Sequence, residues 1–256
     1  MEDRSVLILG HGSRRPRANA EFEALVARFR ARRPGLDVGH AYIELAEPLL
    51  ADGLAASARR ARRVSVLPLF LFAAGHVKHD VPGALAEAAR RFPQIRFEAS
   101  PALGVDPALV TTALERAGAA VPIRSDAAAR TVLLAVGRGS SDPDANGDFC
   151  KLARVVGEGG GFARAEPCFI AITGPGFEEA AARIALSRPE RVLVLPYFLF
   201  EGVLVEELRE KVARLAAAHP AIDVRLAEHL GPDERLLDVL EHRLAAVDGP
   251  DEARAA

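Results

Sequence analysis

The stretch SVLILGHGSRRPRANAEFEAL (residues 5–25) contains a strand, a turn and the start of a helix. It opens on the apolar run SVLIL, and Gly10 and Gly12 follow at the point where the chain must turn. Farther on, apolar side chains return at helical spacing, as at Phe22 and Leu25. An apolar strand that passes through a glycine turn into an amphipathic helix is typical of one unit of a parallel sheet covered by helices.

The same alternation continues through the first half of the chain. Further strands are predicted at the apolar runs 38–45, 64–72 and 95–100. The segments between the runs carry apolar residues at helical spacing, which predicts helices over 17–33, 48–63 and 82–92. Strands that alternate with helices require crossover connections, so we expect an α/β fold with a mostly parallel sheet and helices on both faces.

The second half of the chain repeats the first. GHGSRRPRANAEFEAL (10–25) aligns without gaps on GRGSSDPDANGDFCKL (137–152). Three more pairs follow in the same order: AYIELAEP (41–48) on CFIAITGP (168–175), RVSVLPLFLF (63–72) on RVLVLPYFLF (191–200), and FPQIRFEASPALGVDPALV (92–110) on HPAIDVRLAEHLGPDERLL (219–237). The agreement predicts an internal duplication, with one domain over 1–120 and a second over 130–248.

Certain polar residues of the first repeat are absent from the second, although the apolar and glycine positions survive. His11 matches Arg138, Glu44 matches Ala171, and His76 matches Val203 or Leu204, depending on a one-residue gap. Since the second repeat keeps the architecture without these side chains, we infer that they serve a task of the first domain rather than its folding.

His11, Glu44 and His76 each lie at or just beyond the end of a predicted strand. The carboxyl ends of parallel strands meet at one edge of the sheet, where open α/β sheets bind ligands. Two imidazoles and one carboxylate suit Co²⁺, Ni²⁺, Fe²⁺ or Zn²⁺, and three protein ligands leave coordination positions free, as in catalytic sites. Taken singly, a histidine after a strand is more often a turn residue or a satisfied hydrogen-bonding group than a ligand, and Glu44 could be a solvated strand end.

Two neighbouring histidines are interpreted differently. His79 lies one helical turn from His76 only if the loop is helical, and Asp80 with Pro82 predicts a helix that is capped by Asp80 and starts later. An outer hydrogen-bonding role, or no role, is therefore expected for His79. His40 shares a strand with Glu44, and we expect it in the core or at the rim of the site.

Composition excludes several classes of function. The formal net charge of −2 gives no reason to expect nucleic acid or an anionic membrane surface as a partner. The two cysteines form no CxxC motif, which argues against a disulfide framework, a thiolate zinc site or an iron–sulfur cluster. No apolar stretch approaches the roughly 20 residues of a membrane span, and the N-terminal run is too short for a signal peptide. We expect a soluble, cytoplasmic protein.

The loop after the first strand matches no nucleotide-binding pattern. GHGSR lacks the lysine of a Walker loop and the third glycine of a dinucleotide loop. A phosphohistidine phosphatase would have arginine directly before the histidine, where this chain has Gly10. A hydrolase or phosphotransferase would have to use Ser13 as its nucleophile, and this alternative stays open at the level of the sequence.

Together, GHGSR after the first strand, YIELAEP at the second and LPLFLFAAGHVKHDVP at the third resemble the sirohydrochlorin chelatases of the class II chelatase superfamily. The resemblance covers essentially the whole chain and is greatest to the long, two-domain form that inserts cobalt or iron. It implies two flavodoxin-like domains with a tetrapyrrole cleft between them, and no nucleotide or permanently bound cofactor. The second, degenerate domain would form the other wall of the cleft.

The resemblance also implies roles for individual residues. His11 and His76 match the metal-binding and catalytic histidines of the family, and Glu44 matches their acidic partner. The substrate, sirohydrochlorin, carries many carboxylates, and the cations near the site that could bind them are Arg14, Arg15, Lys78 and Arg138. The implied activity is insertion of Co²⁺ in the first place, then Fe²⁺ or Ni²⁺, in cobalamin or siroheme biosynthesis.

Two properties are left open by the sequence. The protein could be a monomer or a homodimer whose only partners are sirohydrochlorin and the metal ion. A non-catalytic metal or tetrapyrrole carrier on the same fold is the alternative to an enzyme, because the same ligands could bind and release both molecules without accelerating insertion.

Overall fold

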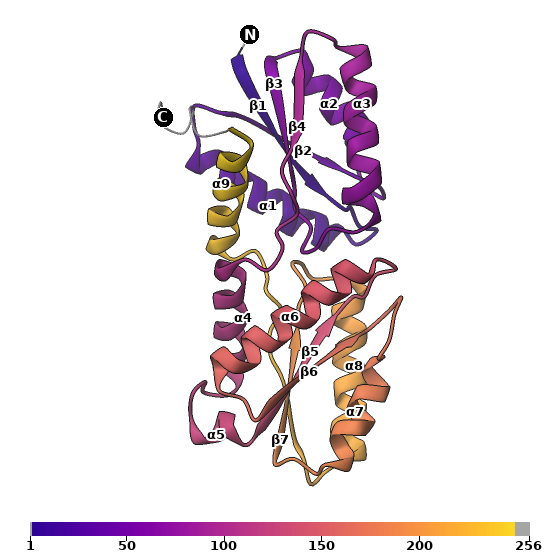
Figure 1. Ribbon diagram of the computed structural model, residues 1–256, viewed down its shortest axis with the longest axis vertical. Coiled ribbons are helices and arrows are strands. Elements are labelled where there is room, and N and C mark those ends of the chain that lie inside the picture. The colour runs from indigo at the N-terminus through magenta and orange to yellow at the C-terminus, as the bar shows by residue number, and fades with distance from the viewer. Residues whose placement is uncertain (1, 249–256) are drawn as a thin grey trace. The chain divides into compact units, whose positions relative to one another are not determined.

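The computed structural model of the protein describes residues 2–248, which form two compact units (Figure 1). The first unit takes the chain up to Gly104 and again from Glu234, and the second unit takes Val105–Asp233. Within residues 2–248, no helix is both long and apolar enough to cross a lipid bilayer.

The first unit is built on a sheet of four parallel strands in the order β2-β1-β3-β4. Its elements are β1 (Glu2–Gly10), α1 (Pro16–Arg32), β2 (Asp37–Tyr42), α2 (Leu50–Ala58), β3 (Ala61–Pro68), a π-helical turn (His76–Asp80), α3 (Val81–Arg91), β4 (Arg96–Ala99) and α9 (Glu234–Asp248). The central strand β1 is buried on both faces, which explains why its sequence is a continuous apolar run rather than an alternating one.

Helices cover both faces of this sheet. Leu7 and Leu9 of β1 pack in one cluster with residues of α2 and α3. α1 contributes buried residues of its own and contacts β2 and α9, and α9 in turn contacts β3 (Figure 1). Because β1, β2 and β3 are parallel, the loops that follow them leave the sheet at one edge and can carry functional side chains there.

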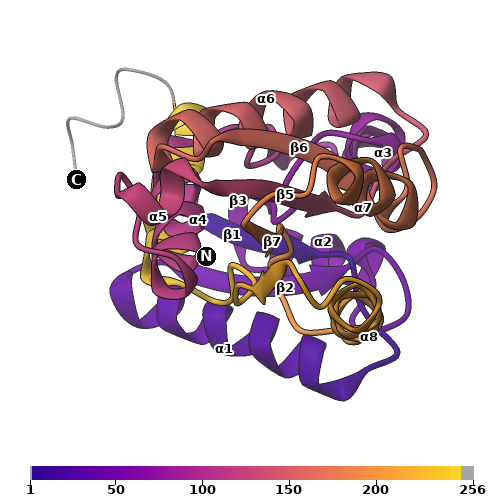
Figure 2. The same ribbon diagram turned by 90° about the horizontal axis from the view of Figure 1, so that it is seen from below.

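The second unit repeats this arrangement with the strand order β6-β5-β7-β8, again all parallel. Its elements are α4 (Pro107–Ala120), α5 (Asp126–Ala129), β5 (Thr131–Gly137), α6 (Pro143–Gly160), β6 (Arg164–Phe169), α7 (Phe177–Leu186), β7 (Arg191–Pro196), α8 (Val203–Ala218) and β8 (Asp223–Leu226). Figure 2 shows β5, β6 and β7 between α6 on one side and α8 on the other. The predicted fold class, two tandem α/β domains with parallel sheets, is confirmed.

The compact units differ from the predicted domains, 1–120 and 130–248, by one helix each. α4 follows β4 in the chain but packs on α6 and β7 of the second unit, whereas α9 follows β8 but packs on α1 and β3 of the first. Matching arginines fasten both helices: Arg116 donates to the carbonyl of Leu230, and Arg243 donates to the carbonyl of Leu103. The two repeats have therefore exchanged their last helices.

Ion pairs also hold α9 on the first unit. Arg28, Arg32 and Arg33 of α1 pair with acidic residues of α9, respectively Glu234, Asp238 and Glu241. Apolar residues of α9 supply the burial: Leu236, Leu237, Val239, Leu240 and Leu244. Alignment of the two repeats identifies equivalent helices, but it does not show on which sheet each helix packs. The predicted domain boundaries therefore differ from the observed units.

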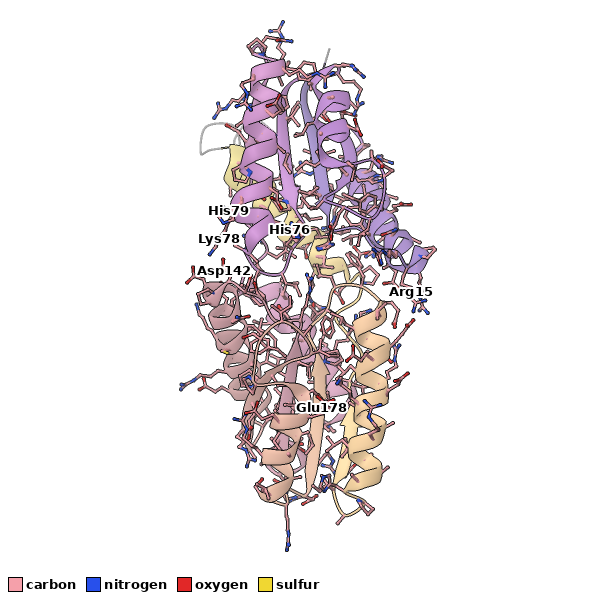
Figure 3. The ribbon with its side chains drawn as sticks, turned by 90° about the vertical axis from the view of Figure 1, so that its right-hand side faces the viewer. Arg15, His76, Lys78, His79, Asp142 and Glu178 are labelled. Atoms are coloured by element: carbon pink, nitrogen blue, oxygen red, sulfur yellow. The ribbon has the colours of Figure 1, made fainter. Side chains whose placement is uncertain are left out.

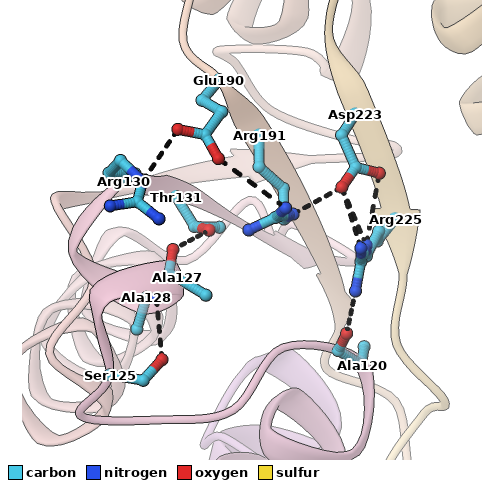
Figure 4. A network of polar contacts seen from close by, with 10 residues as sticks. All are labelled: Ala120, Ser125, Ala127, Ala128, Arg130, Thr131, Glu190, Arg191, Asp223 and Arg225. Atoms are coloured by element: carbon cyan, nitrogen blue, oxygen red, sulfur yellow. Dashed lines mark hydrogen bonds and ion pairs between the residues drawn. The ribbon is translucent and has the colours of Figure 1, made fainter.

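A polar network holds β7 and β8 together at the end of the sheet where these strands begin (Figure 4). The Nε atom of Arg191 lies 2.6 Å from the carboxylate of Asp223, and the Nε atom of Arg225 lies 3.1 Å from the same oxygen. Arg225 also donates to the carbonyl of Ala120 at 2.8 Å. The hydrogen bonds from Arg225 and Arg191 lower the pKa of Asp223 below its ordinary value of 3.8.

We expect Asp223→Asn to lower the free energy of unfolding of the second unit at pH 7 by about 1 kcal/mol or less, because the ion pairs are partly exposed. A carboxyl group whose pKa is lowered by folding stabilises the fold above its unfolded-state pKa, and this contribution is lost as the pH falls through the lowered value. Urea unfolding followed by circular dichroism should therefore show a difference between wild type and variant that shrinks below about pH 4. A difference that stays constant down to pH 2 would contradict this role of the carboxylate.

Candidate metal centre

Three predicted site residues come together at the carboxyl end of the first sheet. His11, Glu44 and His76 each offer one ligand atom, and these atoms all lie within 4.8 Å of one another. The Nε2 atom of His11 is 3.7 Å from Oε1 of Glu44. The rings of His11 and His76 meet nearly at right angles, with centroids 5.1 Å apart. The arrangement has the size and the donor types of a first-row transition-metal site with open coordination positions.

Backbone contacts hold His11 and Glu44 side by side. The amide of Ile43 donates to the carbonyl of Gly10, and the amide of Glu44 donates to the carbonyl of His11, both at 3.0 Å. Gly12 has a φ of +89°, and a Cβ atom at this position would overlap the carbonyl oxygen of Glu44. The glycine is therefore required both by its left-handed conformation and by the close approach of the two loops.

The second unit keeps this backbone without the ligands. The amide of Ala171 donates to the carbonyl of Arg138 at 3.0 Å, as Glu44 does to His11 in the first unit. Gly139 has a φ of +87°, and a Cβ atom there would overlap the carbonyl oxygen of Ala171. The loop geometry thus belongs to the fold of both repeats, whereas the imidazole and carboxylate side chains are found in the first repeat alone.

The turn that carries His76 differs from the sequence prediction. The helix was expected to start after His79 with Asp80 as its cap, but the helical backbone begins at His76, and Asp80 accepts no capping hydrogen bond. Instead, the carboxylate of Asp80 lies 2.6 Å from Nδ1 of His76. The spacing of His76 and Asp80 is a signal for this contact, because residues four apart on a helical turn face each other. The contact was not predicted from the sequence because no helical turn was expected here.

The four predicted substrate-binding cations and His79 are exposed. Figure 3 shows Lys78 and His79 at the outer side of the turn, with His76 nearer to the sheet. Arg14 and Arg15 lie exposed ahead of α1, within the first unit. Arg138 is exposed at the end of β5 in the second unit, at the place that His11 takes in the first. His79 does not belong to the cluster of ligand atoms.

Ser13 has a structural role that both repeats share. Its hydroxyl oxygen accepts a hydrogen bond from the amide of Arg15 at 3.1 Å, and Ser140 accepts one from the amide of Asp142 at 3.0 Å. The amide group of Asn19 donates to the carbonyl of Ser13 at 2.8 Å. Since the second repeat builds the same turn without His11, the serine shapes the loop, and this argues against its use as a nucleophile.

His40 packs beside the site rather than in it. Its ring meets Phe22 and Tyr42 edge-on, with centroids 5.9 and 5.6 Å away. Burial lowers the pKa of His40, and burial together with the hydrogen bond to Glu23 raises the pKa of Tyr42. Burial thus favours the neutral forms of the imidazole and the phenol, which agrees with the expected place of His40 in the core or at the rim.

Comparison with known proteins places this geometry in a family. The CbiX family model matches the chain twice, over residues 5–120 and 132–247, once in each repeat. A sirohydrochlorin cobaltochelatase of Priestia megaterium is 32% identical over 244 residues, which are 94% of this chain and 78% of the relative. A sirohydrochlorin ferrochelatase of Bacillus subtilis (strain 168) is 31% identical over 229 residues, 89% of this chain and 85% of the relative.

The solved structures agree with the sequence relatives. SirB from Bacillus subtilis with Fe³⁺ superimposes with a TM-score of 0.84 at 27% identity, and 98% of each chain is covered. The complex of SirB from Bacillus subtilis subspecies spizizenii with cobalt gives a TM-score of 0.82 at 28% identity, covering 98% of this chain and 97% of the other. The resemblance inferred from three short motifs is confirmed over nearly the whole chain. The chain belongs to the CbiX family.

Proposed function

We propose that the chain is a sirohydrochlorin chelatase, a lyase-type enzyme that inserts a divalent metal ion into the tetrapyrrole sirohydrochlorin without using ATP. The observation that carries the proposal is the convergence of three ligand atoms, from His11, Glu44 and His76, within 4.8 Å at the carboxyl end of the first sheet. The relatives named as cobalto- and ferrochelatases supply the substrate class.

The donor set suits a metal that must be released. Three protein ligands leave coordination positions free on the metal ion, and the tetrapyrrole nitrogens can occupy them before the protein ligands dissociate. Glu44 is exposed and both histidines are half-buried, so the ion can be approached from solvent and from the substrate. A closed, four-ligand site of the structural type would hold the ion too tightly for transfer.

Insertion exchanges protons for metal without a redox step. Two pyrrole N–H bonds break, metal–nitrogen bonds form in their place, and the two protons leave the macrocycle. An imidazole nitrogen that has released the metal can accept a proton near neutral pH, so His11 and His76 are the catalytic residues of the proposal as well as metal ligands. Glu44 is the third metal ligand and offsets the positive charge of the ion.

The carboxylates of the substrate require cations. Arg14 and Arg15 ahead of α1 and Lys78 beside His76 are exposed in the first unit, and cations of this kind form charge-assisted hydrogen bonds with carboxylates. Arg138, exposed in the second unit, is the fourth cation of the proposal. The three cations of the first unit favour a polyanionic substrate over a neutral one.

The proposed metal is Co²⁺ first and Fe²⁺ second, with Ni²⁺ as a further candidate. The same His and Glu ligands accept all three ions, and availability in the cell decides much of the selection. We therefore place the reaction in cobalamin or siroheme biosynthesis, in the cytoplasm. We propose that the protein acts as a monomer or a homodimer and that its partners are sirohydrochlorin and the metal ion.

The test is an insertion assay with the full-length chain. Purified, metal-free protein is mixed with sirohydrochlorin and, separately, with Co²⁺, Fe²⁺ or Ni²⁺, and the absorbance change of the tetrapyrrole is followed against a protein-free control. We expect insertion to be accelerated for at least one ion, with Co²⁺ fastest. Tight binding of both molecules without acceleration would instead identify a carrier and overturn the enzymatic proposal.

A further inference from the structure

Asp80 contacts His76, one of the three proposed metal ligands. The Oδ2 atom of Asp80 lies 2.6 Å from Nδ1 of His76, which is a short, charge-assisted hydrogen bond. We propose that Asp80 is a positioning residue that fixes the tautomer and the ring orientation of His76, so that its Nε2 lone pair is presented to the metal. The inference rests on the proposed role of His76 as a metal ligand.

The tautomer follows from the chemistry of the two groups. A carboxylate offers acceptors only, so the proton in this hydrogen bond must sit on Nδ1 of His76. In a neutral imidazole, the other nitrogen then carries the lone pair, and that nitrogen is Nε2. Metal-bound histidines in proteins almost always donate their second N–H to a carboxylate, a carbonyl or water, and such partners also make the ligand nitrogen more basic.

The local backbone brings the two side chains together. The turn is held by main-chain hydrogen bonds, in which the amide of Lys78 donates to the carbonyl of Ala74 at 2.9 Å and the amide of Val81 donates to that of His76. Asp80 itself has helical dihedral angles and caps nothing. The side chain of Asp80 is therefore not needed to form the turn. The role of its carboxylate is to be sought in the hydrogen bond with His76.

The second repeat supports this separation of roles. The corresponding helix α8 begins at Val203 with no histidine, and the residue that matches Asp80 is Glu207 or Leu208, depending on the same one-residue gap. Glu207 pairs with Lys211 at 3.3 Å. Where the histidine is missing, no residue of the second repeat reproduces the pairing of an imidazole with a carboxylate four residues later within this helix.

Nitrogen NMR of the metal-free protein tests the tautomer directly. In ¹⁵N-histidine-labelled chain at a pH where the imidazole is neutral, long-range ¹H–¹⁵N spectra distinguish a protonated Nδ1 from a protonated Nε2. We expect His76, assigned by comparison with His76→Ala, to be protonated on Nδ1 in the wild type and in Asp80→Asn, whose amide oxygen still accepts the bond. Asp80→Ala should show a mixture of both forms.

Binding of Co²⁺ alone tests the consequence. We expect Asp80→Ala to weaken Co²⁺ affinity by about 10–100-fold, and Asp80→Asn to recover a large part of the loss. Glu87→Ala removes another exposed carboxylate from the same helical segment, one that pairs with Arg90, and it should leave the affinity unchanged. Equal thermal unfolding of all variants would exclude loss of folding as the cause.

The outcomes separate this inference from the proposed function. A wild-type His76 protonated on Nε2, or an Asp80→Ala variant with unchanged tautomer and Co²⁺ affinity, overturns the inference even if metal insertion is fast. The expected tautomers and affinities uphold it even if no insertion is found, and in that case only the enzymatic part of the proposed function fails.

Discussion

His11→Ala and His76→Ala are each expected to lower the rate of metal insertion by about 100-fold or more, while the protein stays folded. Each substitution removes one of the three ligand atoms that lie within 4.8 Å, and with it a proton acceptor for the pyrrole nitrogens. Both effects act on the chemical step, so the loss should appear in kcat more than in KM for sirohydrochlorin. The measurement is the insertion assay under saturating tetrapyrrole, combined with titration of Co²⁺.

His79→Ala is the matched control for these variants. His79 lies in the same π-helical turn as His76 but is exposed and outside the ligand cluster. We expect it to retain insertion close to the wild-type rate. If His79→Ala lost as much activity as His76→Ala, the turn as a whole rather than the ligand set would be responsible, and the assignment of His76 as a ligand would be wrong.

Gly12→Ala is expected to destabilise the first unit by about 2–5 kcal/mol and to abolish Co²⁺ binding. The left-handed φ of +89° costs a non-glycine residue about 1–2 kcal/mol. Overlap of the new methyl group with the carbonyl of Glu44 adds about 1–3 kcal/mol of overpacking. Relief of the overlap would push the loops of His11 and Glu44 apart, and two of the three ligands would separate. Chemical denaturation and Co²⁺ titration measure the two effects.

Gly139→Ala provides the comparison within the same chain. Its φ of +87° and the overlap of its methyl group with the carbonyl of Ala171 match those of Gly12. We therefore expect a similar loss of stability, in the second unit, with Co²⁺ affinity retained. Co²⁺ without tetrapyrrole is the proper probe, because Arg138 next to Gly139 is a proposed contact of the substrate carboxylates. Equal loss of Co²⁺ affinity in both variants would contradict a metal site confined to the first repeat.

Much of the fold follows from patterns that the chain carries locally. The apolar runs predicted β1, β3 and β4, and the helical spacing predicted α1 over 17–33, where the helix spans Pro16–Arg32. Strand ends were predicted less well. The run VSVLPLFLF continues to 72 whereas β3 ends at Pro68, and the strand expected over 38–45 ends at Tyr42. Apolar residues beyond the strand are needed to pack the loop on the core, so their pattern does not mark its end.

The convergence of His11, Glu44 and His76 was predictable for a topological reason. Each of them follows a strand, and parallel strands place their carboxyl ends at one edge of the sheet, however far apart they lie in the chain. Loss of all three in the second repeat identified them among the histidines and carboxylates of the first. The observed contacts between their ligand atoms agree with this prediction, and their chemical roles stay a proposal.

The sequence by itself determined the duplicated α/β pattern, the parallel sheets and the edge at which the ligands meet. Hydrophobic periodicity is a local property, and strands that alternate with helices are joined by crossovers that make them parallel. Only the tertiary structure decided that α4 and α9 pack on the opposite repeats and that Asp80 pairs with His76. An apolar helix face has the same sequence signature whichever sheet buries it, so the choice depends on contacts made elsewhere, such as Arg243 with Leu103. The hydrogen bond between His76 and Asp80 forms only if the turn places the two side chains at the right distance, and the folded backbone determines that distance.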